Sequence, residues 1–146
     1  MREVCLLLSQ DIRSRNVTVA IPDSKTNVTV DSTELQEVLL NLLSNSLYWV
    51  TRVRRGQQRR IKFDIEREPD GALSIYVSDT GPGIPEGDRP RIFEPYFTTR
   101  EGGIGLGLSI AGQIIEDYYG GSLELISPGL LEGATFRATL RRRVGP

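Results

Sequence analysis

Residues 60–85, RIKFDIEREPDGALSIYVSDTGPGIP, hold the clearest signal for the fold of this chain. Residues 60–67 and 73–78 are rich in β-branched and aromatic side chains and predict two strands. Between them, Pro69-Asp70-Gly71 has the chemistry of a tight turn, so the two strands should form an antiparallel hairpin. Asp79 follows the second strand at once and opens a loop rich in glycine and proline.

Helical and strand patterns precede this hairpin. Residues 4–12 carry apolar side chains at helical spacing and predict a short helix, and residues 17–21 and 28–30 predict two short strands. Asp31 and Glu34 then have the spacing of a capping box, which predicts the start of a helix.

That helix is expected to be long. It should run to about Arg54, with Gly56 as its stop. An apolar stripe along it predicts the side that faces the core, and its members are Leu35, Val38, Leu39, Leu42, Trp49 and Val50.

After the hairpin, residues 79–103 form a long loop, and a loop of this length inside a compact domain is usually functional. Residues 106–119 predict a helix closed by Gly120-Gly121, and residues 122–126 and 134–142 predict two more strands. Because the pattern has no βαβ regularity, we expect an α+β fold, a two-layer α/β sandwich. Its length, 146 residues, predicts one domain over 1–146.

Composition excludes several kinds of chemistry. The chain contains no histidine, which rules out a Ser-His-Asp nucleophile and a histidine metal site. Cys5 is the only cysteine, so the chain holds no internal disulfide, as expected in a reducing compartment. The formal charge of −1 predicts no nucleic-acid partner. No apolar run reaches the ~18 residues of a membrane span, so we expect a soluble domain in the cytoplasm, whose parent protein could still be membrane-anchored.

Two asparagines on the long helix suggest a metal site. Asn41 and Asn45 lie one turn apart in a leucine-rich helix, where asparagine lowers helix propensity and adds nothing to packing. Amide oxygens are hard ligands suited to Mg²⁺, which keeps several waters and shares phosphate oxygens with the protein. A solvated helix face is the alternative interpretation.

The loop offers a nucleotide contact. Asp79 stands before Gly81 and Gly83, so an exposed carboxylate is expected beside a backbone that an aromatic ring can approach closely. Such a carboxylate could accept an amino proton from adenine in a charged hydrogen bond of about 1.5 to 3 kcal/mol. An ordinary glycine turn is the alternative interpretation.

A second glycine-rich segment, residues 102–108, opens the last helix, where free amides and the helix dipole favour an anion. It is neither a Walker loop nor a dinucleotide fingerprint, because the residues that define those motifs are missing. Leu106 and Leu108 should anchor it to the core. Just before it, Arg100 could meet a terminal phosphate with its planar fork. Phe93 and Phe97 could equally well belong to the core.

Taken in order, these segments resemble the catalytic, ATP-binding (HATPase) domain of bacterial sensor histidine kinases, in the gyrase, Hsp90, histidine kinase and MutL superfamily. Residues 41–46 resemble the N box, residues 79–83 the G1 box, residues 93–97 the F box and residues 103–108 the G2 box. Four such boxes in the right order cover nearly the whole chain, from about residue 2 to 140.

The resemblance implies a Bergerat fold, with a mixed, mostly antiparallel sheet covered by helices on one face, and it implies ATP and Mg²⁺ as ligands. Asn45, helped by Asn41, would coordinate Mg²⁺, Arg100 would approach the γ-phosphate, and Asp79 would hold the adenine amino group. The other implied contacts are Gly81, Gly83, Ile84, Trp49, Tyr48 and Phe97 in the pocket, Gly102, Gly103, Ile104, Gly105, Leu106, Gly107 and Leu108 in the lid, and Thr135 near adenine.

Position 41 distinguishes branches of the superfamily. Its ATPases resemble one another in having a glutamate there that activates water, whereas Asn41 cannot accept a proton. The resemblance therefore implies phosphoryl transfer to a histidine on a separate dimerisation domain, with a response regulator downstream and a monomeric isolated domain. Two alternatives stay open, a serine kinase of the anti-sigma type and a nucleotide-sensing module without transfer.

Three positions depart from the family pattern. Tyr48 stands where many sensor kinases have a lysine, which leaves one phosphate contact unaccounted for and keeps the sensing module open. Trp49 would lie against adenine or in the core, and Ile104 replaces a frequent threonine in the lid. An arginine cluster at the end of the long helix is read as a solvated surface, with a phosphate contact or an acidic partner as alternatives; its members are Arg52, Arg54, Arg55, Arg59 and Arg60.

Overall fold

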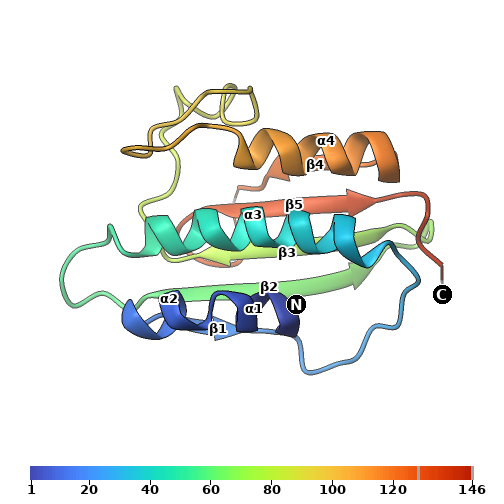
Figure 1. Ribbon diagram of the computed structural model, residues 1–146, viewed down its shortest axis with the longest axis horizontal. Coiled ribbons are helices and arrows are strands. Elements are labelled where there is room, and N and C mark those ends of the chain that lie inside the picture. The colour runs from blue at the N-terminus through green and yellow to red at the C-terminus, as the bar shows by residue number, and fades with distance from the viewer. Residues whose placement is uncertain (128, 146) are drawn as a thin grey trace.

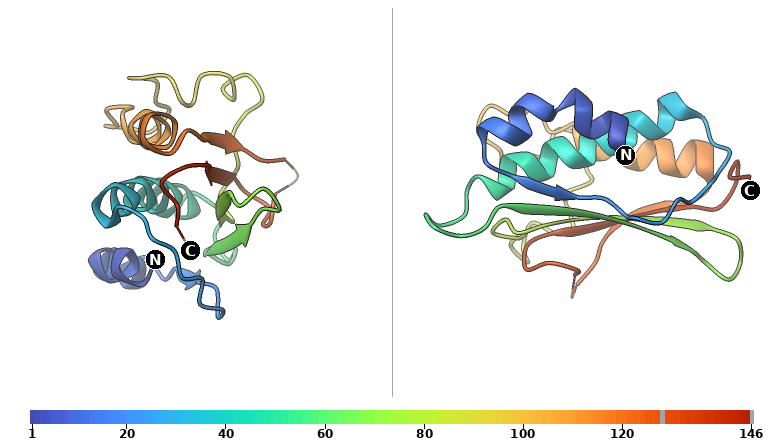
Figure 2. Two further views of the ribbon diagram at one scale, coloured as in Figure 1. Left: turned by 90° about the vertical axis from the view of Figure 1, so that its right-hand side faces the viewer. Right: turned by 90° about the horizontal axis from the view of Figure 1, so that it is seen from below.

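A computed structural model describes residues 1–127 and 129–145. Its elements in chain order are α1 (Arg2–Leu7), α2 (Ser9–Ser14), β1 (Thr18–Ala20), α3 (Ser32–Val50), β2 (Arg60–Arg67), β3 (Leu73–Asp79), α4 (Gly107–Tyr119), β4 (Ser122–Leu125) and β5 (Thr135–Leu140). The five strands form one sheet in the order β1-β2-β3-β5-β4, and the helices cover one of its faces (Figures 1 and 2). The predicted α+β two-layer sandwich is confirmed.

The hairpin forms as predicted. β2 and β3 pair antiparallel from Arg67 opposite Leu73 to Ile61 opposite Asp79, so Asp79 is the last residue of its strand. In the turn, Asp70 Oδ1 accepts the Ala72 N–H at 3.0 Å. Gly71 adopts a φ of +87°, which only glycine reaches without strain.

The sheet is mixed and mostly antiparallel, as the resemblance implied, although the sequence pattern did not indicate which strands pair parallel. β1 pairs parallel with β2, so β1, α3 and β2 form a single βαβ unit beside an otherwise antiparallel sheet. β1 has only three residues, which is too short for its sequence pattern to reveal which neighbour it pairs with.

The long helix α3 starts where the capping residue predicts. Asp31 Oδ1 accepts the N–H groups of Thr33 and Glu34 at 3.0 and 3.1 Å. The reciprocal half of the capping box does not form, because Glu34 Oε1 instead accepts from Arg143 at 3.3 Å.

The end of α3 corrects the prediction, because the helix stops at Val50 rather than near Arg54. The side chains of Thr51 and Arg52 both donate to the carbonyl of Tyr48, at 2.8 and 3.3 Å, and so satisfy the last turn without further helix. Gly56, the expected stop, lies in the loop that follows.

The N-terminal region differs in two details. The single short helix expected over 4–12 is two helices, α1 and α2, that meet at Leu8, and Leu7 is 65% exposed rather than packed. The expected strand 28–30 is reduced to one bridge between Thr29 and Gly145. The last two strands, β4 and β5, are one and three residues shorter than predicted.

The core lies between the sheet and the helices. Strand alternation puts Ile75 and Val77 on the face of β3 that the helices cover, and Val38 and Leu42 of α3 pack onto it, all at most 1% exposed. Asp79 lies in the same alternation as Val77 and therefore also points toward the helices.

The space around two glycines, one inside α4 and one just after it, predicts opposite effects on stability when alanine replaces them. A side chain added at Gly112, inside α4, would meet nothing within 4 Å, so Gly112→Ala should raise the free energy of unfolding by about 0.5 to 1 kcal/mol through helix propensity. A Cβ at Gly121 would overlap the carbonyl oxygen of Thr139, so Gly121→Ala should lower it by more than about 1 kcal/mol. Urea denaturation followed by circular dichroism measures both, and changes of the same sign would contradict the packing described for these positions.

Candidate functional site

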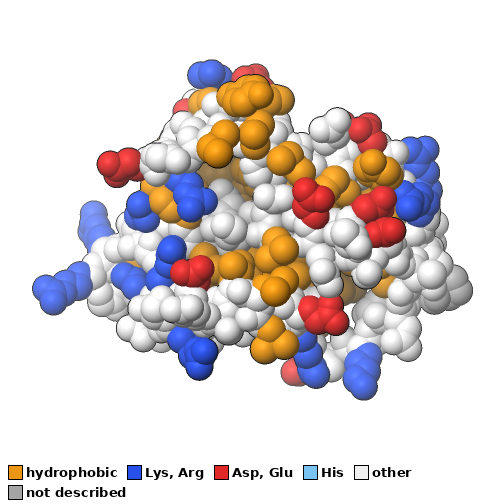
Figure 3. Space-filling view, viewed as in Figure 1, with side chains coloured by type: hydrophobic (Ala, Val, Ile, Leu, Met, Phe, Trp, Pro, Cys, Tyr) orange, Lys and Arg blue, Asp and Glu red, His pale blue; other side chains and the backbone are white. Residues whose placement is uncertain are grey.

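A cavity of about 1310 Å³ opens between the C-terminal half of α3 and the long loop that joins β3 to α4. The loop stands beside the end of α3 (Figure 1), and the surface is hollowed below it (Figure 3). The predicted site residues that line this cavity are Asn41, Asn45, Tyr48, Trp49, Gly83, Ile84, Phe97, Arg100, Gly102, Gly103, Ile104, Gly105, Leu106, Gly107 and Leu108. Asp79, Gly81 and Thr135 do not line it.

Asp79 lies behind the cavity wall, and here the structure corrects the prediction of an exposed carboxylate, because Asp79 is only 1% exposed. Its Oδ1 accepts the N–H groups of Gly81 at 2.8 Å and Ala134 at 3.3 Å. Its Oδ2 is buried and has no hydrogen-bond partner among the described residues, and the same is true of Ser46 Oγ. Asp79 therefore keeps one acceptor oxygen without a hydrogen bond, although the Ser46 hydroxyl lies near the carboxylate.

Burial raises the pKa of Asp79 above its ordinary value. The N–H groups of Gly81 and Ala134 and the nearby Ser46 hydroxyl act in the opposite direction, since they stabilise the carboxylate. A strongly desolvated acid with a free acceptor oxygen is typical of a functional site.

Two glycines make room for this carboxyl group. A Cβ at Gly81 would lie 2.8 Å from Asp79 Oδ1 and 3.2 Å from Trp49 Cβ, and a Cβ at Gly133 would collide with Asp79 Oδ1 and with the Gly81 nitrogen at 2.7 Å. Glycine is thus required at both positions by close approach to the acid. The sequence did not reveal two further contacts of the Asp79 carboxylate. Ser46 acts through a buried hydroxyl on the inner side of α3, and Ala134 acts through its backbone N–H.

Thr135 lies on the other side of the sheet. It pairs with Ser78 across β3 and β5, so it shares the face of Ser78 and not that of Asp79. Its hydroxyl contacts Ser78 Oγ at 2.6 Å and accepts the Leu130 N–H at 3.2 Å. The structure therefore gives the predicted adenine-side contact of Thr135 no support.

The asparagine pair faces the cavity. Asn41 Nδ2 donates to the Glu37 carbonyl at 3.0 Å, which leaves Oδ1 as a free acceptor, and a Cβ on Gly107 would lie 3.1 Å from that oxygen. Asn45 lines the cavity one turn later on α3. The described residues hold no group of three histidine, cysteine or acidic side chains that could bind a metal. A donor set of amide oxygens fits Mg²⁺ that takes its other ligands from phosphates and water.

The lid, residues 102–108, is tied to the loop before it. Tyr96 N–H donates to the Gly105 carbonyl at 2.8 Å, and a Cβ on Gly105 would lie 2.6 Å from the Tyr96 carbonyl carbon. Leu108 packs against the core as expected, whereas Leu106 lines the cavity and is not one of the residues packed on the core. No side chain caps α4, so its first N–H groups are open to an anion.

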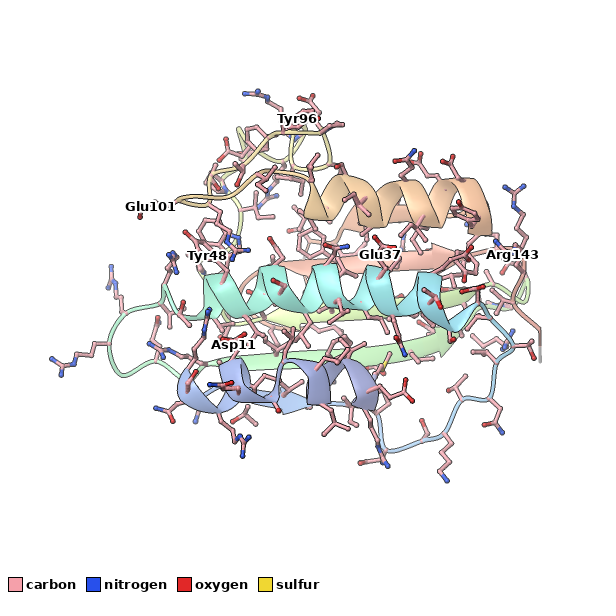
Figure 4. All side chains as sticks on the ribbon, viewed as in Figure 1. Asp11, Glu37, Tyr48, Tyr96, Glu101 and Arg143 are labelled. Atoms are coloured by element: carbon pink, nitrogen blue, oxygen red, sulfur yellow. The ribbon has the colours of Figure 1, made fainter. Side chains whose placement is uncertain are left out.

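The aromatic residues divide between core and cavity. Phe93 packs edge-on against Phe136, with ring centroids 6.1 Å apart, and Phe97 is partly buried and lines the cavity. Trp49 also lines the cavity and meets Tyr48 edge-on at 4.9 Å. In Figure 4, Tyr48 and Glu101 lie where the loop approaches the C-terminal end of α3, whereas Tyr96 lies at the outer end of the loop.

A two-layer sandwich with a buried acid, an asparagine pair and a glycine lid defines a nucleotide-binding ATPase domain. Residues 30–144 match the family described as Histidine kinase-, DNA gyrase B-, and HSP90-like ATPase, and the chain belongs to that family. It is a histidine kinase ATPase domain of the kind found in sensor kinases.

Several known sensor kinases are similar to this chain in sequence or in structure. The sensor protein TdiS of Thauera aromatica is 34% identical over 143 residues, which cover 96% of this chain and 26% of TdiS. The catalytic domain of histidine kinase ThkA superposes with a TM-score of 0.79 at 32% identity, covering 97% of this chain and 89% of that one. ShkA in complex with AMPPNP gives a TM-score of 0.76 at 26% identity, covering 97% and 30%.

ThkA is also known in complex with the response regulator protein TrrA, and that kinase matches with a TM-score of 0.75 at 31% identity, covering 95% of this chain and 38% of ThkA. The chain spans about a quarter of the length of the curated relatives it matches. In the part of the chain that the structure describes, no helix combines the length and apolar character needed to cross a membrane.

Proposed function

We propose that this domain binds Mg-ATP in the cavity and transfers the γ-phosphoryl group to a histidine on a separate dimerisation domain of its parent sensor kinase. The buried Oδ2 of Asp79, which lacks a partner, is the observation that carries the proposal. An unpaired buried carboxylate oxygen is costly, and the amino group of adenine is a donor that would satisfy it.

The remaining roles follow from position. Gly81, Gly83 and Ile84 would shape the adenine pocket, with Trp49 and Phe97 as its apolar walls. Asn45 and Asn41 would hold Mg²⁺, which neutralises charge on the phosphates when bound. Arg100 would contact the γ-phosphate, and residues 102–108 would cover the phosphates with backbone N–H groups at the start of α4.

In the transfer itself, the bond between the γ-phosphorus and its bridging oxygen breaks, a bond to a histidine nitrogen forms, and ADP leaves. This chain contains no histidine, so the acceptor belongs to another part of the parent protein or to another chain. Asn41 has no basic group with which to activate water, which favours the histidine over hydrolysis. The domain's own contribution is therefore positioning and charge neutralisation.

The wider setting belongs to the same proposal. A response regulator would receive the phosphoryl group downstream, as the ThkA complex with TrrA suggests by analogy. Dependence on ATP and a free Cys5 agree with a cytoplasmic domain, whose parent protein could be membrane-anchored. Asn41 in place of a glutamate disfavours a serine kinase, whereas Tyr48 in place of a lysine favours a second candidate, a nucleotide-sensing module that transfers nothing.

The direct test is transfer in trans. The purified chain is mixed with Mg-ATP labelled on the γ-phosphate and with the histidine-bearing dimerisation domain of its parent sensor kinase. We expect the label to appear on that domain and to be lost when its acceptor histidine is replaced by alanine. The chain incubated alone should carry no phosphohistidine. Saturable ATP binding without transfer to this dimerisation domain would favour the sensing module, and no ATP binding would contradict both proposals.

A further inference from the structure

Tyr48 lies at the C-terminal end of α3, beside the start of the lid (Figure 4). It is only 8% exposed, although it faces the cavity. Two guanidinium groups cover its ring, because Arg52 Cζ lies 3.5 Å and Arg100 Cζ 4.4 Å from the ring centroid. Its hydroxyl accepts the N–H of Glu101 at 3.1 Å, immediately before the lid. One side chain thus connects α3, two cations and the lid.

The two cations lack acidic partners. Within the described part of the chain, neither Arg52 nor Arg100 forms a salt bridge. Both sit on one ring, closer to each other than the Debye length of about 8 Å at physiological ionic strength, so they repel each other. Four arginines and two acids line the cavity: Arg15, Arg52, Arg59, Arg100, Asp88 and Glu101. Positive side chains also gather on this side of the surface (Figure 3).

Arg52 is held in place with donors to spare. Its Nη1 donates to the Tyr48 carbonyl at 3.3 Å and to Thr51 Oγ1 at 3.2 Å. In the described residues, Nε and Nη2 have no acceptor, so part of the guanidinium fork remains available to a ligand. Because a ring and a carbonyl already hold this cation in place, it loses little further conformational freedom when it binds an anion.

From these contacts we infer that Arg52 is a second phosphate-binding residue, which pairs with Arg100 across Tyr48 to hold the terminal phosphates of the nucleotide. Tyr48 is the positioning residue, because its ring fixes both guanidinium groups and its hydroxyl fixes the start of the lid. The inference rests on the proposed binding of ATP in this cavity. It also explains how a site with tyrosine in place of lysine keeps its positive charge, since the arginine one turn later supplies it.

The experiment compares ATP with adenosine, because only ATP has the phosphates that Arg52 would contact. Isothermal titration of Arg52→Gln should show ATP bound about tenfold more weakly, with adenosine unchanged. Arg55→Gln removes the same charge from an exposed position outside the cavity and should leave ATP affinity within about twofold. Equal losses in Arg52→Gln and Arg55→Gln, or a loss of adenosine binding equal to that of ATP, would overturn the inference.

Tyr48 is tested by rescue. Tyr48→Leu removes the ring and should weaken ATP binding about as much as Arg52→Gln, whereas Tyr48→Phe keeps the ring and should restore most of it. Thermal unfolding shows whether the variants are folded, and Arg52→Gln by itself decides the inference if Tyr48→Leu is not. Full ATP affinity in a folded Tyr48→Leu would overturn the positioning role. If the wild-type chain binds ATP but Arg52→Gln and Arg55→Gln have the same ATP affinity, this inference alone is overturned. If the wild-type chain binds no ATP, the proposed function is overturned as well.

Discussion

Asp79→Asn should weaken ATP binding by about a hundredfold, as measured by isothermal titration. The asparagine keeps an oxygen where Oδ1 accepts from Gly81 and Ala134, so the local backbone is undisturbed. At the place of Oδ2, however, it has an amide NH₂ group, a donor that would face the amino group of adenine, which is also a donor. A hydrogen bond to a charged acceptor is thus replaced by two opposed donors, which accounts for the size of the loss.

Two measurements distinguish lost recognition from lost structure. Asp117→Asn makes the same chemical change on the exposed side of α4 and should not alter ATP affinity. Because burial raises the pKa of Asp79, its ionisation disfavours the folded state, so the stability it contributes is full below its ordinary pKa and is lost as the pH rises through the raised value. Asp79→Asn should therefore be as stable as wild type at low pH and more stable at neutral pH. Unchanged ATP affinity would refute the adenine assignment.

Asn45→Ala should remove the Mg²⁺ dependence of ATP binding and lower phosphoryl transfer at least about a hundredfold, since a metal ion is worth several kcal/mol to the charged transition state. The loss comes from the metal, because the alanine keeps the helix and the cavity-facing stripe intact. ATP affinity measured over a series of Mg²⁺ concentrations, together with the transfer assay, checks it. In wild type the affinity should rise with Mg²⁺, and in the variant it should stay flat.

Asn27→Ala is the matched control, because Asn27 is exposed in the segment before α3 and does not line the cavity. It should retain both the Mg²⁺ dependence and the transfer rate. A Mg²⁺ dependence that persists in Asn45→Ala would place the metal on other ligands, and Asn41 would then be the first to test, since its Oδ1 has no partner while its Nδ2 is bound to the Glu37 carbonyl.

Several features of the fold could be predicted because their causes are local. The hairpin follows from Pro69-Asp70-Gly71, the start of α3 from Asp31, and the end of α4 from Gly120, which adopts the left-handed conformation that ends helices. Features with distant causes were predicted less well. The end of α3 depends on side chains that return to Tyr48, and the pairing of β1 depends on β2, about 40 residues later.

The candidate site divides in the same way. Its chemical groups could all be identified from the residues: two amides one turn apart, an acid before a glycine turn, a glycine lid after an arginine, and no histidine. The proposed phosphoryl acceptor therefore comes from elsewhere. The order and spacing of these groups were enough to predict the family.

Only the tertiary structure decided how these groups face one another. Strand alternation buried Asp79 on the helix side, where an exposed carboxylate had been predicted, and placed Thr135 on the other face of the sheet. The approach of the loop before the lid to Tyr48 brought Arg100 onto the same ring as Arg52, although the two arginines are 48 residues apart in sequence. The burial of Asp79, its free acceptor oxygen and the Tyr48 ring shared by Arg52 and Arg100 all depend on contacts between segments distant in sequence. No local pattern of residues encodes such contacts.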